Sequence, residues 1–201
     1  MAPWRLGGNA LGSTRRHGFS IVADDCWGGD VYRHLERPYE TPFVGLFVRS
    51  EDYLRLLGDL RGYLAQPLRF RDRFGESGGT RYPVGLLEDV EIHFLHYRHR
   101  GHADVTWNRR LARLDFNRLA VKFSAAPDER AHDQVERFAR LPFERKVAFS
   151  RVAVPGAVHV PNWSWRDAFA ETQSVFDAEA WLRGRSPHRR RSFSNGRSTR
   201  A

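Results

Sequence analysis

Short runs of apolar residues alternate along this chain with segments whose apolar residues recur at helical spacing, and no other feature constrains its fold as strongly. Continuous apolar runs of this length are typical of strands that are buried on both faces of a sheet. The runs are FSIVA (19–23), FVGLFV (43–48), LAVKF (119–123) and KVAFS (146–150). YPVGLL (82–87) and VEIHFLHY (90–97) predict two more strands, and the Gly-, Arg- and Ser-rich stretch 71–81 predicts a loop.

Helical patterns fill the intervals between the predicted strands. Tyr53, Leu56 and Leu60 recur at helical spacing after Ser50, which we expect to cap that helix. Similar patterns predict further helices over 30–36, 103–114 and 131–138. Because strands and helices alternate, we predict an α/β fold, a three-layer sandwich with a mostly parallel sheet and helices on both of its faces.

The length and composition fit one domain. A chain of 201 residues, 41% of them hydrophobic, can build one good core but not two. Residues 1–16 show no periodicity and are expected to form a flexible N-terminal segment, and residues 17–184 are predicted to form a single α/β domain. Residues 185–201 are rich in arginine and poor in large apolar residues, so we predict a disordered tail.

The net charge of +9 is concentrated at the two ends of the chain. Residues 1–16 and 183–200 hold ten arginines and no acid, so the rest of the chain carries 23 basic against 24 acidic side chains. A nucleic-acid-binding protein should carry a basic face on its folded part, and we therefore expect no nucleic-acid partner. For the tail we expect weak contact with anionic lipid, worth ~1 kcal/mol per basic residue near the surface.

The cysteine content and hydropathy indicate the compartment. Cys26 is the single cysteine, which precludes an intramolecular disulfide and fits a reducing compartment. No stretch approaches the roughly 18 apolar residues that a membrane span requires. We therefore expect a cytoplasmic protein without a membrane span.

The turn after the first predicted strand, DDCWGG (24–29), is the first candidate site. It ends a strand and opens a helix, where unpaired N–H groups and the helix dipole favour a phosphate. Gly28 and Gly29 would let the backbone approach the diphosphate of a sugar nucleotide, with Trp27 beside it. The alternative is a tight turn with Trp27 packed in the core.

Asp25 and the neighbouring Asp24 have several possible roles. Asp25 is predicted to contact the substrate at the ribose or to cap the following helix. A divalent cation shared with Asp24 is another option, but adjacent residues on a strand point in opposite directions, whereas hard cations need several oxygen ligands. We therefore predict no metal site.

Cys26 itself is a candidate catalytic residue. A thiol at a helix N-terminus can have a lowered pKa and act as a nucleophile beside a histidine. Most lone cysteines, in contrast, are small buried hydrophobic residues. The sequence leaves both interpretations open.

A glutamate and a histidine form the second candidate site. If 90–97 is a strand, Glu91 and His93 leave the same face, and a carboxylate beside an imidazole fixes its tautomer and raises its basicity. His93 is the predicted general base and Glu91 its orienting partner, although such a pair can also be structural. His96 falls on the opposite face, with Ile92, and is predicted to be a hydrogen-bonded core residue.

Asn108, Arg109 and Arg110 form the third candidate site, on the helix after that strand. Arginine binds phosphate with two parallel hydrogen bonds, so these residues are predicted to position a diphosphate. A solvated helix face is the alternative interpretation. Together the three sites predict a cleft formed by 24–30, 85–93 and 107–110.

Several segments, in one order, resemble a family of bacterial proteins of unknown function that are often labelled as exopolysaccharide-biosynthesis proteins. They are FSIVADDCWGG (19–29), TPFVGLFV (41–48), YPVGLLEDVEIHFLHY (82–97), WNRRLARL (107–114), LAVKF (119–123), LPFERKVAF (141–149) and, weakly, FDAEAWLRG (176–184). The resemblance implies a link to polysaccharide synthesis but supplies no reaction. The family pattern has amides in place of Asp24 and Asp25, so no metal role for these carboxylates follows from it.

The leading hypothesis is a transferase, glycosyltransferase-like with an activated-sugar donor, in bacterial exopolysaccharide or capsule biosynthesis. Its partners would be a nucleotide sugar or a polysaccharide intermediate, and the sequence identifies no cofactor. One alternative is a non-catalytic accessory or carbohydrate-binding protein of the same pathway, in which Trp163 and Trp165 stack on sugar rings. The other is an acyl transferase with Cys26 as its nucleophile.

Overall fold

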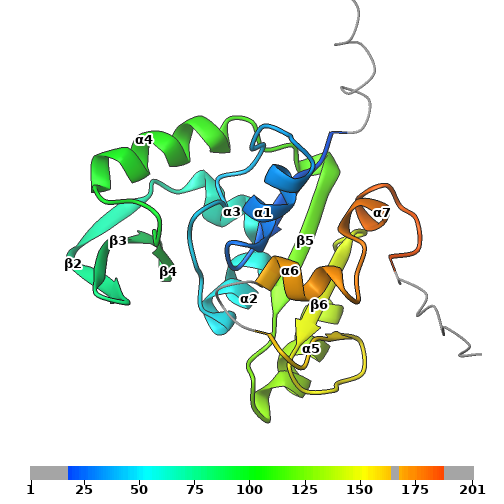
Figure 1. Ribbon diagram of the computed structural model, residues 1–201. Helices are drawn as coiled ribbons and strands as arrows, with labels where there is room; N and C mark the ends of the chain where they lie inside the picture. The colour runs from blue at the N-terminus through cyan, green and yellow to red at the C-terminus, as the bar shows by residue number, and fades with distance from the viewer. Residues whose placement is uncertain (1–17, 164–167, 188–201) are drawn as a thin grey trace, which may run out of the picture.

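A parallel sheet forms the centre of the structure. The computed structural model describes residues 18–163 and 168–187. Within these ranges four strands pair in parallel, in the order β1-β5-β6-β7 (Figure 1). Their bounds are Ser20–Ala23 for β1, Leu119–Ser124 for β5, Lys146–Ser150 for β6 and Val158–His159 for β7. The predicted α/β fold with a parallel sheet is confirmed.

Helices pack on both faces of this sheet. They are α1 (Trp27–His34), α2 (Ser50–Gly58), α3 (Leu60–Ala65), α4 (Arg100–Leu111), α5 (Arg130–Ala139), α6 (Ala168–Gln173) and α7 (Ala178–Leu182), with a 3-10 helix over Phe116–Arg118. Neighbouring strand residues point to opposite faces. Ile21 therefore joins the core cluster that contains Trp27 of α1, and Val22 joins the cluster that contains Leu57 of α2. This division of the core gives the layers of an α/β sandwich.

A second, antiparallel sheet stands beside the first and was not predicted as such. It consists of β2 (Arg69–Ser77), β3 (Thr80–Leu87) and β4 (Val90–His93), in that order. The predicted loop over 71–81 is wrong, because this stretch is half of a hairpin. Gly78 and Gly79 form its two-residue turn with positive φ angles of 55° and 75°, which glycine adopts without strain.

The apolar run 43–48 is buried but does not form a strand of the parallel sheet, so that prediction is wrong. Gly45 has a φ of 74°, which interrupts extended backbone. Phe47 forms an isolated antiparallel bridge with His93, and the N–H of Val48 donates to the carbonyl oxygen of Asp24 at 2.8 Å. The segment therefore connects β4 of one sheet to the end of β1 in the other.

Two element boundaries also differ from the sequence prediction. Helix α2 begins at Ser50, but the Ser50 hydroxyl donates to the carbonyl oxygen of Ser124 at 3.3 Å and does not cap the helix. Strand β4 ends at His93, and residues 94–97 form a turn in place of the predicted strand continuation. The turn redirects the side chains of 94–97, which matters for the site described below.

The described part of the chain continues past the predicted domain end at residue 184. The N–H of Asp177 donates to the carbonyl oxygen of Pro187 at 2.8 Å, which holds residues 185–187 against α7. The predicted flexible segment 1–16, the tail from 188 onward and Trp165 lie outside the described residues. Among the helices that are described, none is long and apolar enough to cross a membrane.

Helix α1 packs closely on β1 and on Val44 because two of its residues lack side chains. A Cβ atom at Gly28 would lie 2.9 Å from Cγ2 of Ile21 and 3.2 Å from Cβ of Ala23. A Cβ atom at Gly29 would lie 3.1 Å from Cγ1 of Val44. The two glycines thus allow close contact between the helix and its neighbours, which places the residues just before them at the edge of the sheet.

We expect Gly28→Ala to destabilise the protein by ~1–3 kcal/mol, the usual result of overpacking a core. The contacted methyl group belongs to a β-branched side chain on a buried strand, which has little freedom to move. Gly58→Ala is the matched control, since its Cβ would meet no atom within 4 Å. Urea unfolding of both variants tests this: equal midpoints would show that α1 does not depend on the missing side chain.

Candidate functional site

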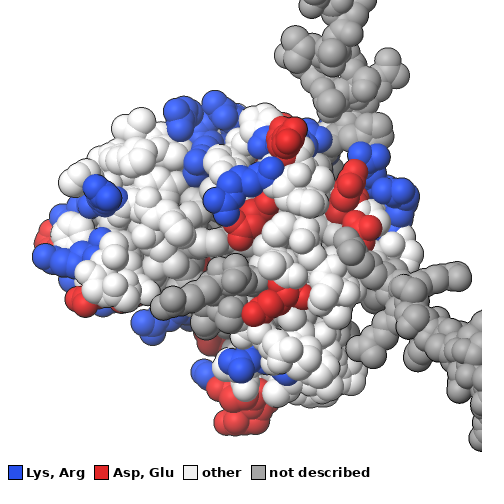
Figure 2. Space-filling view, in the orientation of Figure 1, with Lys and Arg blue, Asp and Glu red and all other residues white. Residues whose placement is uncertain are grey.

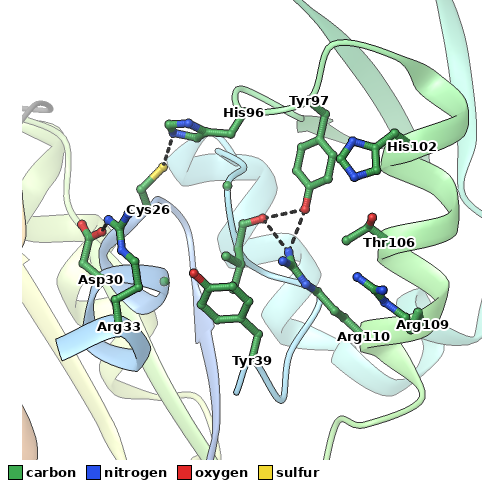
Figure 3. A pocket seen from close by; sticks show the side chains of 13 residues that line it. Cys26, Asp30, Arg33, Tyr39, His96, Tyr97, His102, Thr106, Arg109 and Arg110 are labelled. Carbon is green, nitrogen blue, oxygen red and sulfur yellow. Dashed lines mark hydrogen bonds and ion pairs between the residues drawn. The ribbon is translucent and has the colours of Figure 1, made fainter. Parts of the chain in front are cut away.

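A cavity of about 300 Å³ opens between α1 and α4, beyond the carboxyl end of β1 (Figure 3). Three parts of the chain surround it: the start of α1, the irregular segment around Gly45, and the turn after β4 together with α4. Its lining consists of Cys26, Gly29, Asp30, Arg33, Tyr39, Val44, Gly45, His96, Tyr97, His102, Thr106, Arg109 and Arg110. Of the predicted cleft segments, 24–30 and 107–110 contribute residues to this lining, whereas 85–93 does not.

A cysteine and a histidine meet at one end of the cavity. Sγ of Cys26 lies 3.2 Å from Nε2 of His96, although 70 positions separate the two residues along the chain. The prediction that His96 is a core residue is wrong, because its side chain is exposed. Strand β4 ends at His93, and the following turn directs His96 toward the start of α1 (Figure 3).

The thiol of Cys26 is held in its neutral form. Burial raises its pKa to about 12, and the carboxylates of Asp25 and Asp30 add to the rise. Lys122 and Arg33 oppose this effect without reversing it. The position at a helix N-terminus therefore does not produce a thiolate here, and a base is needed to take the proton before the sulfur can attack.

The wall opposite α1 carries positive charge. Arg110 is held in place, since its guanidinium donates to the Tyr97 hydroxyl at 2.8 Å and to the Val44 carbonyl oxygen at 3.3 Å, and lies 4.6 Å from the centre of the Tyr39 ring. Arg109 is exposed and forms no hydrogen bond or ion pair with any described residue. In the space-filling view, basic side chains gather over α4 and toward α1 (Figure 2). The wall suits an anionic group.

Beneath the turn at residues 24–26 lies a buried charge cluster of Asp24, Asp25, Lys122 and Ser124. Nζ of Lys122 lies 3.1 Å from the Asp24 carboxylate and 2.5 Å from the Asp25 carboxylate, and it also contacts the Ser124 hydroxyl. The Lys122 side chain is fully buried, 4.9 Å from the centre of the Trp163 ring. Trp163 is thus part of the core and does not offer a sugar-stacking surface.

The buried charge cluster also shapes the backbone of the turn. The N–H of Ser124 donates to Asp24 at 3.0 Å, and the N–H of Trp27 donates to Asp25 at 3.0 Å. Asp25 therefore satisfies a free N–H at the start of α1, as the capping alternative predicted. Lys122 and Ser124 already bind both carboxylates, so Asp24 and Asp25 are not available to a metal. The described residues contain no group of three or more His, Cys, Asp or Glu side chains that could hold a metal ion.

The pKa of Asp24 is raised to about 7. Burial is the main cause, the neighbouring Asp25 carboxylate adds to it, and Lys122 opposes it. The physical reason is charge balance: two carboxylates share one ammonium in a site closed to water, so the cluster is neutral when one carboxylate is protonated.

The predicted pair Glu91 and His93 lies outside the cavity. His93 is buried, and neither ring nitrogen has a hydrogen-bond partner among the described residues. Its Nε2 is 3.8 Å from the Glu91 carboxylate, which instead pairs with Arg71 at 2.7 Å and Arg73 at 2.6 Å. Burial lowers the pKa of His93, and Arg49 adds to that effect. The pair lies on β4 of the antiparallel sheet and does not line the cavity that Cys26 enters.

Two predicted substrate contacts also lie away from the cavity. Asn108 bonds to Asp104 on its own helix. Trp27 is fully buried, and its indole N–H donates to the Thr172 hydroxyl at 2.8 Å. The core-packed alternative therefore describes Trp27.

Sequence reasoning missed the residue that organises the turn. Lys122 interrupts the apolar run LAVKF, and a lysine inside a buried strand is costly unless it is paired. A lysine within an apolar run was therefore a signal in the sequence that Lys122 has a buried carboxylate partner. Tyr39, Tyr97 and His102, in contrast, reach the cavity only through tertiary contacts, and no local pattern marks them.

Comparison with known proteins identifies relatives that have no assigned activity. A family described as a domain of unknown function (DUF1919) matches residues 11–175. An uncharacterised protein of Haemophilus influenzae is 33% identical over 167 residues, which cover 82% of this chain and 77% of that protein.

The titration of Asp24 predicts a pH dependence of stability. Its pKa is about 7 in the folded protein against 3.8 as the reference value, so folding takes up a proton between these values. The resulting stabilisation is complete below about pH 4 and is lost as the pH rises through 7. The free energy of unfolding changes by at most ~1.4 kcal/mol per pH unit in this range. We expect Asp24→Asn to reduce this loss, as urea unfolding between pH 5 and 8 would show. Asp72→Asn, at a fully exposed position, serves as control. Identical slopes for wild type and Asp24→Asn would contradict the assignment.

The raised pKa of Cys26 predicts slow alkylation. Because the chain has one cysteine, iodoacetamide at pH 8 reports on Cys26 alone. Asp30→Asn removes one carboxylate that raises the thiol pKa and releases Arg33 from its ion pair, so the alkylation rate should rise ~3–10-fold. Asp133→Asn, on the remote helix α5, should leave the rate unchanged. No acceleration in Asp30→Asn would rule out control of the thiol by Asp30.

Proposed function

We propose that this chain, which belongs to the DUF1919 family, is a transferase that uses the Cys26 thiol as its nucleophile and His96 as its general base. The contact of 3.2 Å between Sγ of Cys26 and Nε2 of His96, inside a cavity with a basic wall, carries the proposal. Nucleophile and base are within hydrogen-bond reach of each other, which is the geometric requirement for this chemistry.

The first half of the reaction would transfer an acyl group to the enzyme. Nε2 of His96 accepts the proton of the Cys26 thiol while the sulfur attacks the carbonyl carbon of an acyl donor. A carbon–sulfur bond forms, the bond to the leaving group breaks, and the leaving group takes the proton from His96. The high pKa of the thiol makes the base essential, because very little thiolate is present without it.

The second half would return the enzyme to its starting state. A hydroxyl group of the acceptor gives its proton to His96 while its oxygen attacks the thioester carbon. The carbon–sulfur bond breaks, and Sγ of Cys26 recovers the proton. Asp25 and Lys122 act as positioning residues, since they hold the turn that carries Cys26 and do not reach the cavity.

Carbohydrates offer many hydroxyl acceptors, which connects this chemistry to the expected pathway. We propose that the acceptor is an intermediate of exopolysaccharide or capsule assembly, and that the reaction takes place in the cytoplasm. Support comes from the sequence resemblance and from the single cysteine, which fits a reducing compartment.

A second candidate is transfer of a sugar from a nucleotide-sugar donor. Arg109 and Arg110 line the cavity on the wall opposite Gly29, and arginines suit a diphosphate. Acyl transfer uses the Cys26–His96 contact, however, which sugar transfer leaves without a role.

Acyl-enzyme formation tests the proposal. The full chain is incubated with acetyl phosphate, acetyl-CoA or p-nitrophenyl acetate, and intact-mass spectrometry detects one acetyl group on Cys26. We expect His96→Gln to slow acylation ~10²–10⁴-fold, the usual loss for a general base. His93→Gln is the matched control, a histidine three positions earlier that lies outside the cavity, and should retain the wild-type rate per folded molecule.

Two outcomes would reject the proposal. If no donor acylates Cys26, the thiol is not a nucleophile of this class, and an accessory role becomes the better explanation. If His93→Gln slows the acylation of Cys26 and His96→Gln does not, while both variants remain folded by circular dichroism, the base is His93.

A further inference from the structure

We propose that the α4 wall of the cavity binds a phosphate group of the substrate and holds it away from the reacting carbon. This inference names the substrate class of the site and rests on the proposed function for the identity of the reacting end. The observations that carry it are three hydrogen-bond donors without partners, their charge, and their position relative to Cys26.

Arg109 supplies a free positive charge. Its guanidinium forms no ion pair or hydrogen bond within the described part of the chain, whereas Arg33 is paired with Asp30 and Arg110 is held by Tyr97. Asp30 is the sole acid in the lining of this cavity, and its charge is already matched by Arg33. The α4 side of the cavity therefore attracts an anion, and no described residue provides one there.

Two hydroxyl groups that line the cavity add further donors. Thr106 is 96% buried and lines the cavity, and its hydroxyl has no hydrogen-bond partner among the described residues. The hydroxyl of Tyr39 likewise has no partner within the described ranges, although the Tyr39 ring is fixed by the guanidinium of Arg110. Neither hydroxyl oxygen is among the buried polar atoms that lack a partner, so both are open to the cavity and can donate to a ligand that accepts hydrogen bonds.

Two of these donors, Thr106 and Arg109, lie on one face of α4. Thr106 is three residues before Arg109 and four before Arg110, and side chains at this spacing are neighbours on a helix. A phosphate group matches this set, because it carries close to two negative charges and three acceptor oxygens. A carboxylate has one charge and two oxygens and would leave part of the set unused.

The donors lie across the cavity from the reacting groups. Figure 3 shows Cys26 and His96 at one end, Thr106 and Arg109 on α4 at the other, and Tyr39 between them. A phosphate bound by α4 is therefore not at the carbon that the thiol attacks. It acts as a remote anchor that orients the substrate, a use of binding energy that favours reaction at the other end.

Two sources supply such a phosphate: a sugar phosphate on the acceptor side, or the phosphates of a coenzyme A thioester on the donor side. Both present the same chemistry to Arg109 and Thr106. Binding experiments with glucose 1-phosphate and with coenzyme A distinguish the two sources, and glucose and pantetheine serve as the corresponding compounds without phosphate.

Isothermal titration calorimetry of the full chain measures the binding. We expect Kd for at least one phosphorylated compound to be ~10-fold or more below that of its unphosphorylated counterpart, and to rise ~10-fold or more in Arg109→Gln. Thr106→Val, which keeps the shape and removes the hydroxyl, should weaken binding by a smaller factor. Arg113→Gln, which removes an exposed arginine just beyond α4 that does not line the cavity, should leave Kd unchanged.

Cys26→Ser separates this inference from the proposed function. The variant should bind the phosphorylated compound as the wild type does, since the anchor does not involve the thiol. Binding without any acyl-enzyme in the wild type would reject the nucleophile and support the phosphate site. If neither phosphorylated compound binds, or if Arg109→Gln and Arg113→Gln weaken binding equally, the α4 wall is not a phosphate site.

Discussion

One ammonium group shared by two carboxylates underlies the arrangement of this site. Lys122 lies inside a strand that is otherwise apolar, fully buried, and within 3.1 Å of Asp24 and 2.5 Å of Asp25. A buried lysine without partners would be unstable, and two buried aspartates without a cation would repel each other. The two carboxylates directly follow β1, and the ammonium group belongs to β5. The parallel register pairs Ala23 with Lys122 and so places these charges together at the carboxyl edge of the sheet.

The consequence of this cluster is a well-defined turn between β1 and α1. Asp25 accepts a hydrogen bond from the first N–H of the helix, and Asp24 accepts one from Ser124 on β5. Cys26 follows directly, so its thiol is presented to the cavity by a backbone that the cluster holds in place. Burial raises the thiol pKa, and Asp25 adds to the rise while Lys122 opposes it. The cluster thus positions a nucleophile that stays protonated, which leaves its activation to His96.

Local pattern predicted the elements of the parallel sheet well and those of the second sheet poorly. The runs at 19–23, 119–123 and 146–150 are strands because continuous apolar sequence fits a sheet covered on both faces. The arginine-rich stretch 71–81 lacks that pattern, since much of it is exposed and Arg71 and Arg73 obtain their partner, Glu91, from another strand. The apolar run 43–48 is buried between the sheets, and burial alone cannot distinguish a strand from an irregular core segment.

The sequence by itself determined the α/β class, the turn that presents Cys26, and the arginines of α4, because each depends on residues that are close together in the chain. Which histidine meets the thiol was decided by the tertiary structure. A difference of three residues, from His93 to His96, moves the imidazole from the antiparallel sheet to the cavity, because β4 ends between them and the chain turns. The pairing of Lys122 with Asp24 and Asp25 required contacts across about 100 positions. Such contacts depend on how the strands are ordered in the sheet, and local sequence does not specify that order.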